Sequence, residues 1–137
     1  MNNQECNEKS ISKILDFIIE LQKKAECIND SSTTGCDRKR LGPTINNGLI
    51  YNTRPITIYS CCNGTLWEFP YTLNGETGTS TVFKISKTDG NCATFEVLAP
   101  NPDTSNPLIP YVSTNNYFTI DLNCVLAIRC LNDTFTN

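Results

Sequence analysis

Between residues 10 and 28, apolar side chains recur three or four positions apart, the spacing of a helix with one apolar face. Ser10 is a suitable N-cap, and Lys23 and Lys24 suit the negative end of the helix dipole. We therefore predict a helix over residues 10–28, after a polar tail at residues 1–9. The predicted stripe consists of Ile11, Ile14, Leu15, Ile18, Leu21 or Gln22, and Ala25.

Two further apolar residues, Phe17 and Ile19, fall outside this stripe. A helix with such residues is either buried on several sides within its own domain or contacts a second surface, such as a neighbouring subunit. Residues 29–48 are rich in Asn, Ser, Thr and Gly, so we predict that they form a connecting loop.

From about residue 49 the pattern changes to the alternation that is typical of strands. Asn63-Gly64 separates two such segments and is a strong signal for a two-residue hairpin turn. That turn would pair Ile58 with Phe69. One face of the hairpin would then carry the apolar side chains of Ile56, Ile58, Trp67 and Phe69.

A second hairpin is predicted between residues 81–87 and 92–98. A two-residue loop would place Ile85 and Phe95 on opposite faces. A three-residue loop at 89–91, with a left-handed residue forming a bulge, aligns Ile85 with Phe95 and also Phe83 with Val97.

Four prolines between residues 99 and 116 predict a long surface loop, with or without a short edge strand. Residues 118–130 then alternate, which predicts one long strand or two strands at a bend. Overall the pattern predicts a mainly β single domain over residues 1–137, with β structure at 49–137. We expect an antiparallel β-sandwich or a barrel-like pair of sheets, with about six to eight strands and one N-terminal α-helix.

Charge and hydropathy exclude several classes of function. The formal net charge of -3 disfavours general nucleic-acid binding, which requires a basic surface. The first residues are polar and acidic, unlike a signal peptide, and the longest apolar stretch, 14–21, is too short to span a bilayer. We therefore expect a protein made inside a cell, without membrane insertion.

The chain has eight cysteines and no histidine. Zinc sites typically use cysteine pairs two to four residues apart, often with histidine, and such pairs are absent from the sequence. Without histidine no Cys-His or Ser-His catalytic arrangement can form. Residues 10–13 match the Ser-x-x-Lys pattern, but the accompanying motifs are missing. We predict no metal, no cofactor and no enzymatic activity.

Crosslinking is the remaining role for the cysteines. The predicted strand alternation turns Cys124 and Cys130 towards the core and Cys61 and Cys92 away from it. Together with Cys6 in the polar tail, the outward pair are the candidates for intermolecular disulfides. The candidates for other disulfides or for buried thiols are Cys27, Cys36, Cys62, Cys124 and Cys130.

Three blocks of sequence resemble the spore coat protein Z family. They are Phe17–Gln22 leading to Cys27, Cys36 and Leu41-Gly42; Asn52-Thr-Arg-Pro-Ile-Thr-Ile-Tyr59; and Thr119–Cys124 with Ala127–Leu131. The blocks occur in the family's order and span most of the chain. On matching positions, the resemblance implies that Cys27, Cys36, Cys92, Cys124 and Cys130 correspond to family cysteines, whereas Cys61 and Cys62 do not.

The resemblance implies a structural protein of the spore coat or exosporium. It implies self-assembly into hexameric units and a two-dimensional lattice, which disulfides then crosslink, with the chain itself and other spore coat proteins as partners. Synthesis in the reducing mother cell, followed by exposure to an oxidising exterior, would explain cysteines in an unexported protein. The alternative is a monomeric carbohydrate-binding β-sandwich that uses Trp67 and exposed tyrosines. Trp67 lies on the predicted core face, which disfavours that alternative.

Overall fold

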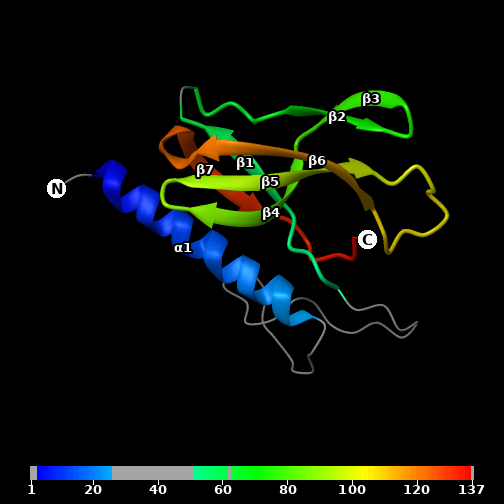
Figure 1. Cartoon of the computed structure of the whole chain (residues 1–137), viewed down its shortest axis with the longest axis horizontal. Coiled ribbons are helices and arrows are strands. Elements are labelled where there is room, and N and C mark those ends of the chain that lie inside the picture. The colour runs from blue at the N-terminus through cyan, green and yellow to red at the C-terminus, as the bar shows by residue number, and fades with distance from the viewer. Residues whose placement is uncertain (1–2, 26–50, 62, 137) are drawn as a thin grey trace.

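The computed structural model describes residues 3–25, 51–61 and 63–136, and within this part it is mainly β (Figure 1). All strand pairs are antiparallel, and one five-stranded sheet has the order β6-β5-β4-β1-β7, beside a two-stranded sheet β2-β3. The predicted fold class is therefore confirmed. The elements are α1 (Asn3–Lys24), β1 (Ile56–Ser60), β2 (Phe69–Leu73), β3 (Glu76–Ser80), β4 (Val82–Asp89), β5 (Cys92–Pro100), β6 (Tyr111–Asp121), a 3₁₀ turn η2 (Leu122–Cys124) and β7 (Val125–Cys130).

The helix begins at Asn3, so Ser10 lies inside it and is not its N-cap. Residues 3–9 contain neither proline nor glycine, and the acidic Glu5 and Glu8 suit the positive end of the helix dipole. These residues therefore extend the helix instead of forming a polar tail. The last residues of the predicted helix, 26–28, and the predicted loop at 29–48 lie outside the described residues.

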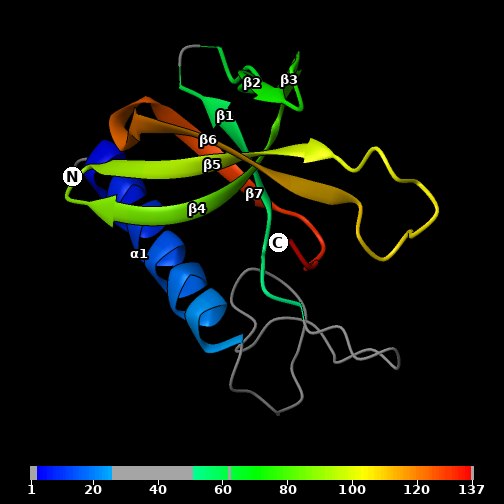
Figure 2. The same ribbon diagram turned by 45° about the vertical axis from the view of Figure 1, so that its right-hand side comes forward.

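The helix is buried on more than one side of its length. Ile11, Leu15 and Ile18 join the main core, and Ile19 packs against the same core. Phe17 instead packs against a second cluster formed by Leu21, Ala25 and Tyr51. The apolar residues outside the predicted stripe therefore belong to the interior of this domain. Figure 2 shows α1 running obliquely beneath β4 and β5.

Phe118 in β6 is at the centre of an aromatic cluster that joins the two sheets. Its ring centroid lies 4.5 Å from that of Phe69 and 5.0 Å from that of Phe83. The ring centroids of Phe95 and Trp67 lie 5.6 and 6.3 Å from that of Phe118. Phe69 is the first residue of β2, and Trp67 lies two residues before it. These ring contacts therefore attach the two-stranded sheet to the core of the larger one.

The first predicted hairpin forms with a different register. Tyr59 bridges Leu66, and the Trp67 N–H donates to the Ile58 carbonyl at 2.8 Å. The predicted pairing of Ile58 with Phe69 is therefore wrong by two residues, and because two is an even number Trp67 and Phe69 still face the core. A tight Asn-Gly turn occurs instead at Asn74-Gly75, where both residues have positive φ and join β2 to β3.

The second hairpin has the predicted core pairs, Phe83 with Val97 and Ile85 with Phe95. The predicted three-residue loop is wrong, because Asp89 pairs with Cys92 across a two-residue turn that begins with Gly90 at φ +61°. The extra residue is Ser86, which bulges from β4. An extra residue in the strand and an extra residue in the loop shift the strand pairing by the same amount. The pairing of the core residues alone therefore does not distinguish a bulge from a longer loop.

The face of β4 and β5 that is opposite Phe83 and Phe95 carries two opposite charges, a buried Glu96 and a half-buried Lys84. Lys84 lies across from Glu96, and Lys84 Nζ donates to Thr136 Oγ1 at 3.5 Å. The buried Glu96 carboxylate accepts hydrogen bonds from the Ser113 hydroxyl and from the Asn115 N–H. Burial lowers the pKa of Lys84 below its ordinary value of 10.5, although the neighbouring Glu96 charge acts in the opposite direction.

This lowered pKa predicts a pH dependence of stability. Between the lowered pKa and 10.5 the unfolded chain binds more protons at this lysine than the folded chain, so the free energy of unfolding should rise with pH. We expect the wild type to gain stability relative to Lys84→Met as the pH is raised from 8 towards 10.5. Urea denaturation of both proteins at each pH measures this difference. A constant difference across that range would contradict the prediction.

Candidate crosslinking surface

Three exposed cysteines lie at one end of the five-stranded sheet. Cys61 follows β1, Cys92 begins β5, and Cys124 ends η2. The Cys61 N–H donates to the Cys124 carbonyl at 2.9 Å, and Cys92 pairs with Asp121, three residues before Cys124. Segments that are far apart in the sequence therefore bring these cysteines to the same end of the sheet. We call this end the cysteine end.

Two tight turns fix the positions of Cys92 and Cys124. The β4–β5 turn supplies the Asn91 carbonyl, which accepts a hydrogen bond from the Leu122 N–H at 2.7 Å. The Asp121 side chain caps η2 by accepting from the Asn123 N–H at 2.9 Å. The backbones that carry Cys92 and Cys124 are thus hydrogen-bonded at neighbouring positions. Both cysteines are exposed free thiols.

Cys124 was predicted to face the core, and it is exposed instead. The alternation holds for Phe118, Ile120 and Leu122, which are buried. The 3₁₀ turn then interrupts the period of two, so Val125 becomes the buried residue. A helical turn advances the chain by about three residues per turn, and it therefore reverses the parity on which the prediction depended.

The remaining cysteines fall into three groups. Cys6 lies in the first turns of α1, and this end of the helix is on the same side of the molecule as the cysteine end (Figure 1). Its side chain lies outside the described part of the structure, as do Cys27, Cys36 and Cys62. Cys130, at the opposite end of β7, is half-buried and packs against the core. The proposed roles of all these cysteines in disulfides stay predictions.

A buried clamp built from Asn52, Thr53 and Arg54 holds the C-terminal segment. Thr53 forms an isolated antiparallel bridge with Thr134, with hydrogen bonds of 3.0 and 2.9 Å in the two directions. The Asn52 side-chain amide donates to the Thr136 carbonyl at 2.8 Å, and its oxygen accepts from the Thr136 N–H at 2.9 Å. The Asn52 amide therefore bonds to both backbone groups of Thr136, as a neighbouring strand would.

An ion pair completes this clamp. Arg54 Nε donates to Asp133 Oδ1 at 2.8 Å and a terminal nitrogen donates to Oδ2 at 3.2 Å, with both side chains almost fully buried. The Arg54 N–H donates to the Gln22 side chain, whose amide in turn donates to the Ile85 carbonyl. The clamp therefore connects the C-terminal segment, the helix and β4. Sequence reasoning identified the Asn-Thr-Arg-Pro block but assigned it no structural role.

We predict that breaking this ion pair destabilises the protein strongly. Asp133→Asn removes the carboxylate charge that lies 2.8 Å from the buried Arg54 guanidinium, and removing one partner of a buried ion pair typically costs about 3–5 kcal/mol. The double variant Arg54→Met/Asp133→Leu removes both charges and should lose less stability than the single variant. Thermal or urea denaturation measures both effects. A single variant as stable as the wild type would contradict this account.

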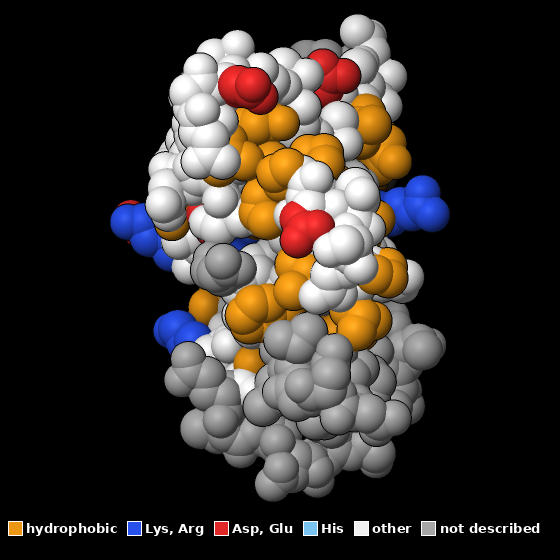
Figure 3. Space-filling view, turned by 90° about the vertical axis from the view of Figure 1, so that its right-hand side faces the viewer, with side chains coloured by type: hydrophobic (Ala, Val, Ile, Leu, Met, Phe, Trp, Pro, Cys, Tyr) orange, Lys and Arg blue, Asp and Glu red, His pale blue; other side chains and the backbone are white. Residues whose placement is uncertain are grey.

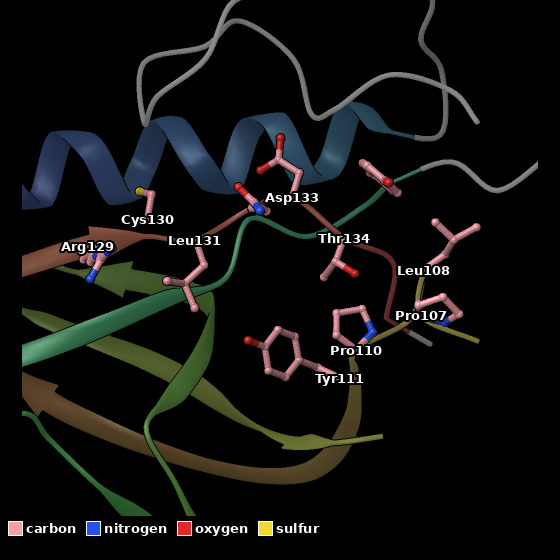
Figure 4. Close-up of a pocket in the computed structure, with 11 residues that line it drawn as sticks. Pro107, Leu108, Pro110, Tyr111, Arg129, Cys130, Leu131, Asp133 and Thr134 are labelled. Carbon is pink, nitrogen blue, oxygen red and sulfur yellow. The ribbon is translucent and has the colours of Figure 1, made fainter. Parts of the chain in front are cut away.

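A cavity of about 550 Å³ lies away from the cysteine end, between the loop before β6 and the C-terminal segment. In Figure 4 Pro107, Leu108, Pro110 and Tyr111 face it from one side, and Leu131 and Thr134 face it from the other. Figure 3 shows apolar side chains in several separate patches on this side of the molecule. The cavity contains no cluster of acidic or cysteine side chains suited to a metal, and no such group of three or more occurs among the described residues.

Trp67 packs into the aromatic cluster and is not a fully exposed ring on which a carbohydrate could stack. It is half-buried, packs against the core and contacts the Phe118 ring. This position disfavours the carbohydrate-binding alternative, which depends on an exposed aromatic ring. No helix within the described ranges is long and apolar enough to cross a membrane.

The family model for Spore coat protein Z matches residues 1–133 of this chain. The chain belongs to the spore coat protein Z family. Spore coat protein Z of Bacillus subtilis (strain 168) is 23% identical over 145 residues, which cover 96% of this chain and 96% of the relative. No solved structure matches. Membership supports a structural role in the spore coat, and it confirms the family that the sequence predicted.

Proposed function

We propose that this protein builds a protective outer layer of a spore by self-assembly. Copies of the chain associate laterally, alone and with other spore coat proteins, into hexameric units and a two-dimensional lattice of the coat or exosporium. Disulfides then crosslink the lattice. The observation that carries this proposal is the group of exposed cysteines at one hydrogen-bonded end of the sheet, in a chain that belongs to a spore coat family.

The arrangement of the cysteine end suits crosslinking between copies. Cys92 and Cys124 are exposed on tight, hydrogen-bonded turns, so their thiols need little backbone movement to meet those of a neighbouring molecule. A disulfide requires Cα atoms within about 7 Å of each other, and only a defined contact between two copies satisfies this for surface cysteines. Non-covalent packing would therefore select which thiols become joined.

The order of events follows from thiol chemistry. In the mother-cell cytoplasm the thiols remain reduced, so the lattice forms through reversible contacts that can correct errors. When the layer reaches the oxidising exterior, adjacent thiols convert to disulfides by exchange through a thiolate. The finished layer then resists conditions that would dissociate the non-covalent contacts. This sequence of events agrees with a structural role and requires no catalytic site.

Electron microscopy of the purified protein tests the assembly. We expect rings or sheets under reducing conditions, because packing precedes crosslinking. After oxidation the same assemblies should persist in denaturant, and a reductant should restore their sensitivity. Dispersed monomers at high concentration, in both redox conditions, would refute the proposal.

Non-reducing electrophoresis of oxidised assemblies tests the crosslinks. We expect single serine variants of Cys6, Cys61, Cys92 and Cys124 to shorten the ladder of high-mass bands, and Cys92→Ser/Cys124→Ser to remove most of it. A matched control adds Thr104→Cys, an exposed site in the loop before β6, to that double variant. It should not restore the ladder, because crosslinking requires adjacency as well as exposure. Unchanged ladders in every variant would show that these cysteines are not the crosslinks.

A further inference from the structure

The sheet exposes a small apolar surface on the face that points away from the core. Tyr59 in β1 pairs with Leu66 on one side and with Ala127 in β7 on the other. Their neighbours Ile58 and Trp67 belong to the core cluster, so Tyr59, Leu66 and Ala127 share the opposite face. We call these three residues and Leu126 the outer patch.

A β-bulge adds Leu126 to this patch. Tyr59 pairs with Ala127 and Ser60 pairs with Val125, so Leu126 is the extra residue of β7. Bulges redirect the side chain of the extra residue, and Leu126 is 51% exposed. A β-carbon placed on Gly64 would lie 3.7 Å from Leu126 Cδ2, so this leucine reaches the turn that leads to Leu66. Leu66 is itself 39% exposed, so two exposed leucines lie on this face, on either side of Tyr59.

Two opposite charges flank the outer patch on its two sides. Glu68 lies two residues beyond Leu66, and Arg129 lies two residues beyond Ala127. Because Trp67 and Phe69 pack against the core, Glu68 between them points to the outer face. Arg129 pairs with Thr57, and alternation puts both on the face of Tyr59 and Ala127. Both charged residues are exposed, and neither has an ion-pair partner in the part of the chain that the structure describes.

We propose that the outer patch is a contact between two copies of this chain, related by a twofold axis parallel to β1. This inference rests on the self-assembly proposed above and names one of its contacts. Strand β1 runs through the middle of the patch, with Leu66 and Glu68 on one side and Leu126 and Arg129 on the other. A twofold rotation about that direction exchanges the two sides.

The rotation makes the patch complementary to itself. Leu66 of one copy comes to face Leu126 of the second copy, and Glu68 faces Arg129, each contact occurring twice. Four leucines leave water and two new ion pairs form across their margin, the usual arrangement of an apolar centre and a polar rim. If a different partner presented only positive or only negative side chains to the outer patch, either Arg129 or Glu68 would lie opposite a like charge. The contact is small, so it acts together with other contacts in the assembly.

Charge reversal tests the pairing of Glu68 with Arg129. The sedimentation of the full-length protein is measured over a series of concentrations. Reducing conditions are used so that disulfides do not contribute to the association. We expect Glu68→Arg and Arg129→Glu each to weaken self-association at least about tenfold, because each places like charges opposite one another. The double variant Glu68→Arg/Arg129→Glu exchanges the charges and should recover association to within about threefold of the wild type.

Removal of the apolar centre is tested with a matched control. Leu126→Ser should weaken association, whereas Tyr117→Ser, at an equally exposed side chain on β6, should not. Unchanged thermal unfolding establishes that each variant is folded. If the wild type assembles and the reversals have no effect, or if the double variant does not recover, this contact is refuted and the proposed function stands. A wild type that stays monomeric in reducing and oxidising conditions refutes the proposed function and this contact together.

Discussion

The buried ion pair between Arg54 and Asp133 is the interaction on which the arrangement of the chain depends. Asp133 follows the last strand, and Arg54 precedes the first one. Together with the Thr53–Thr134 bridge, the pair holds the two ends of the β domain beside each other. The Arg54 backbone also bonds to Gln22 of the helix. Burying either charge without the other would be strongly destabilising. The segments that carry Arg54 and Asp133 must therefore keep these two side chains in contact.

The β-bulges determine which side chains the sheet presents to its surroundings. At Ser86 the bulge keeps the core pairs of β4 and β5 in register although the turn has only two residues. In β6, residues 114–116 lie opposite Val97 alone, and Asn115 takes a positive φ of 59°. At Leu126 the bulge turns an apolar side chain outward. Bulges at both edge strands also hinder indiscriminate strand pairing along the sheet edges.

The positions of the exposed cysteines and of the outer patch are consistent with assembly that precedes crosslinking. The outer patch borders the cysteine end, because Leu126 is two residues from Cys124 and Tyr59 is two residues from Cys61. A reversible contact through apolar side chains and ion pairs would hold neighbouring copies in a defined orientation while the thiols are still reduced. Oxidation would then join only those thiols that the contact had already placed within bonding distance.

Sequence alone determined the elements whose periodicity is long and uninterrupted. The helical spacing from Ile11 to Leu21 and the alternation around Phe83 and Phe95 are local consequences of burying one face, so they specified the helix, the core pairs and the mainly β class. The absence of histidine excluded the catalytic arrangements that need it, and the eight cysteines favoured crosslinking. The three blocks of sequence indicated the family. Tertiary structure decided where those patterns break. Asn63-Gly64 and Asn74-Gly75 both favour a tight turn, but Asn74-Gly75 joins β2 and β3 directly, whereas Asn63-Gly64 lies in a longer connection between the bridged residues Tyr59 and Leu66. The 3₁₀ turn at residues 122–124 exposes Cys124, the bulge exposes Leu126, and Arg54 meets Asp133 across 79 positions of sequence. These features depend on contacts between distant segments, which no local pattern encodes.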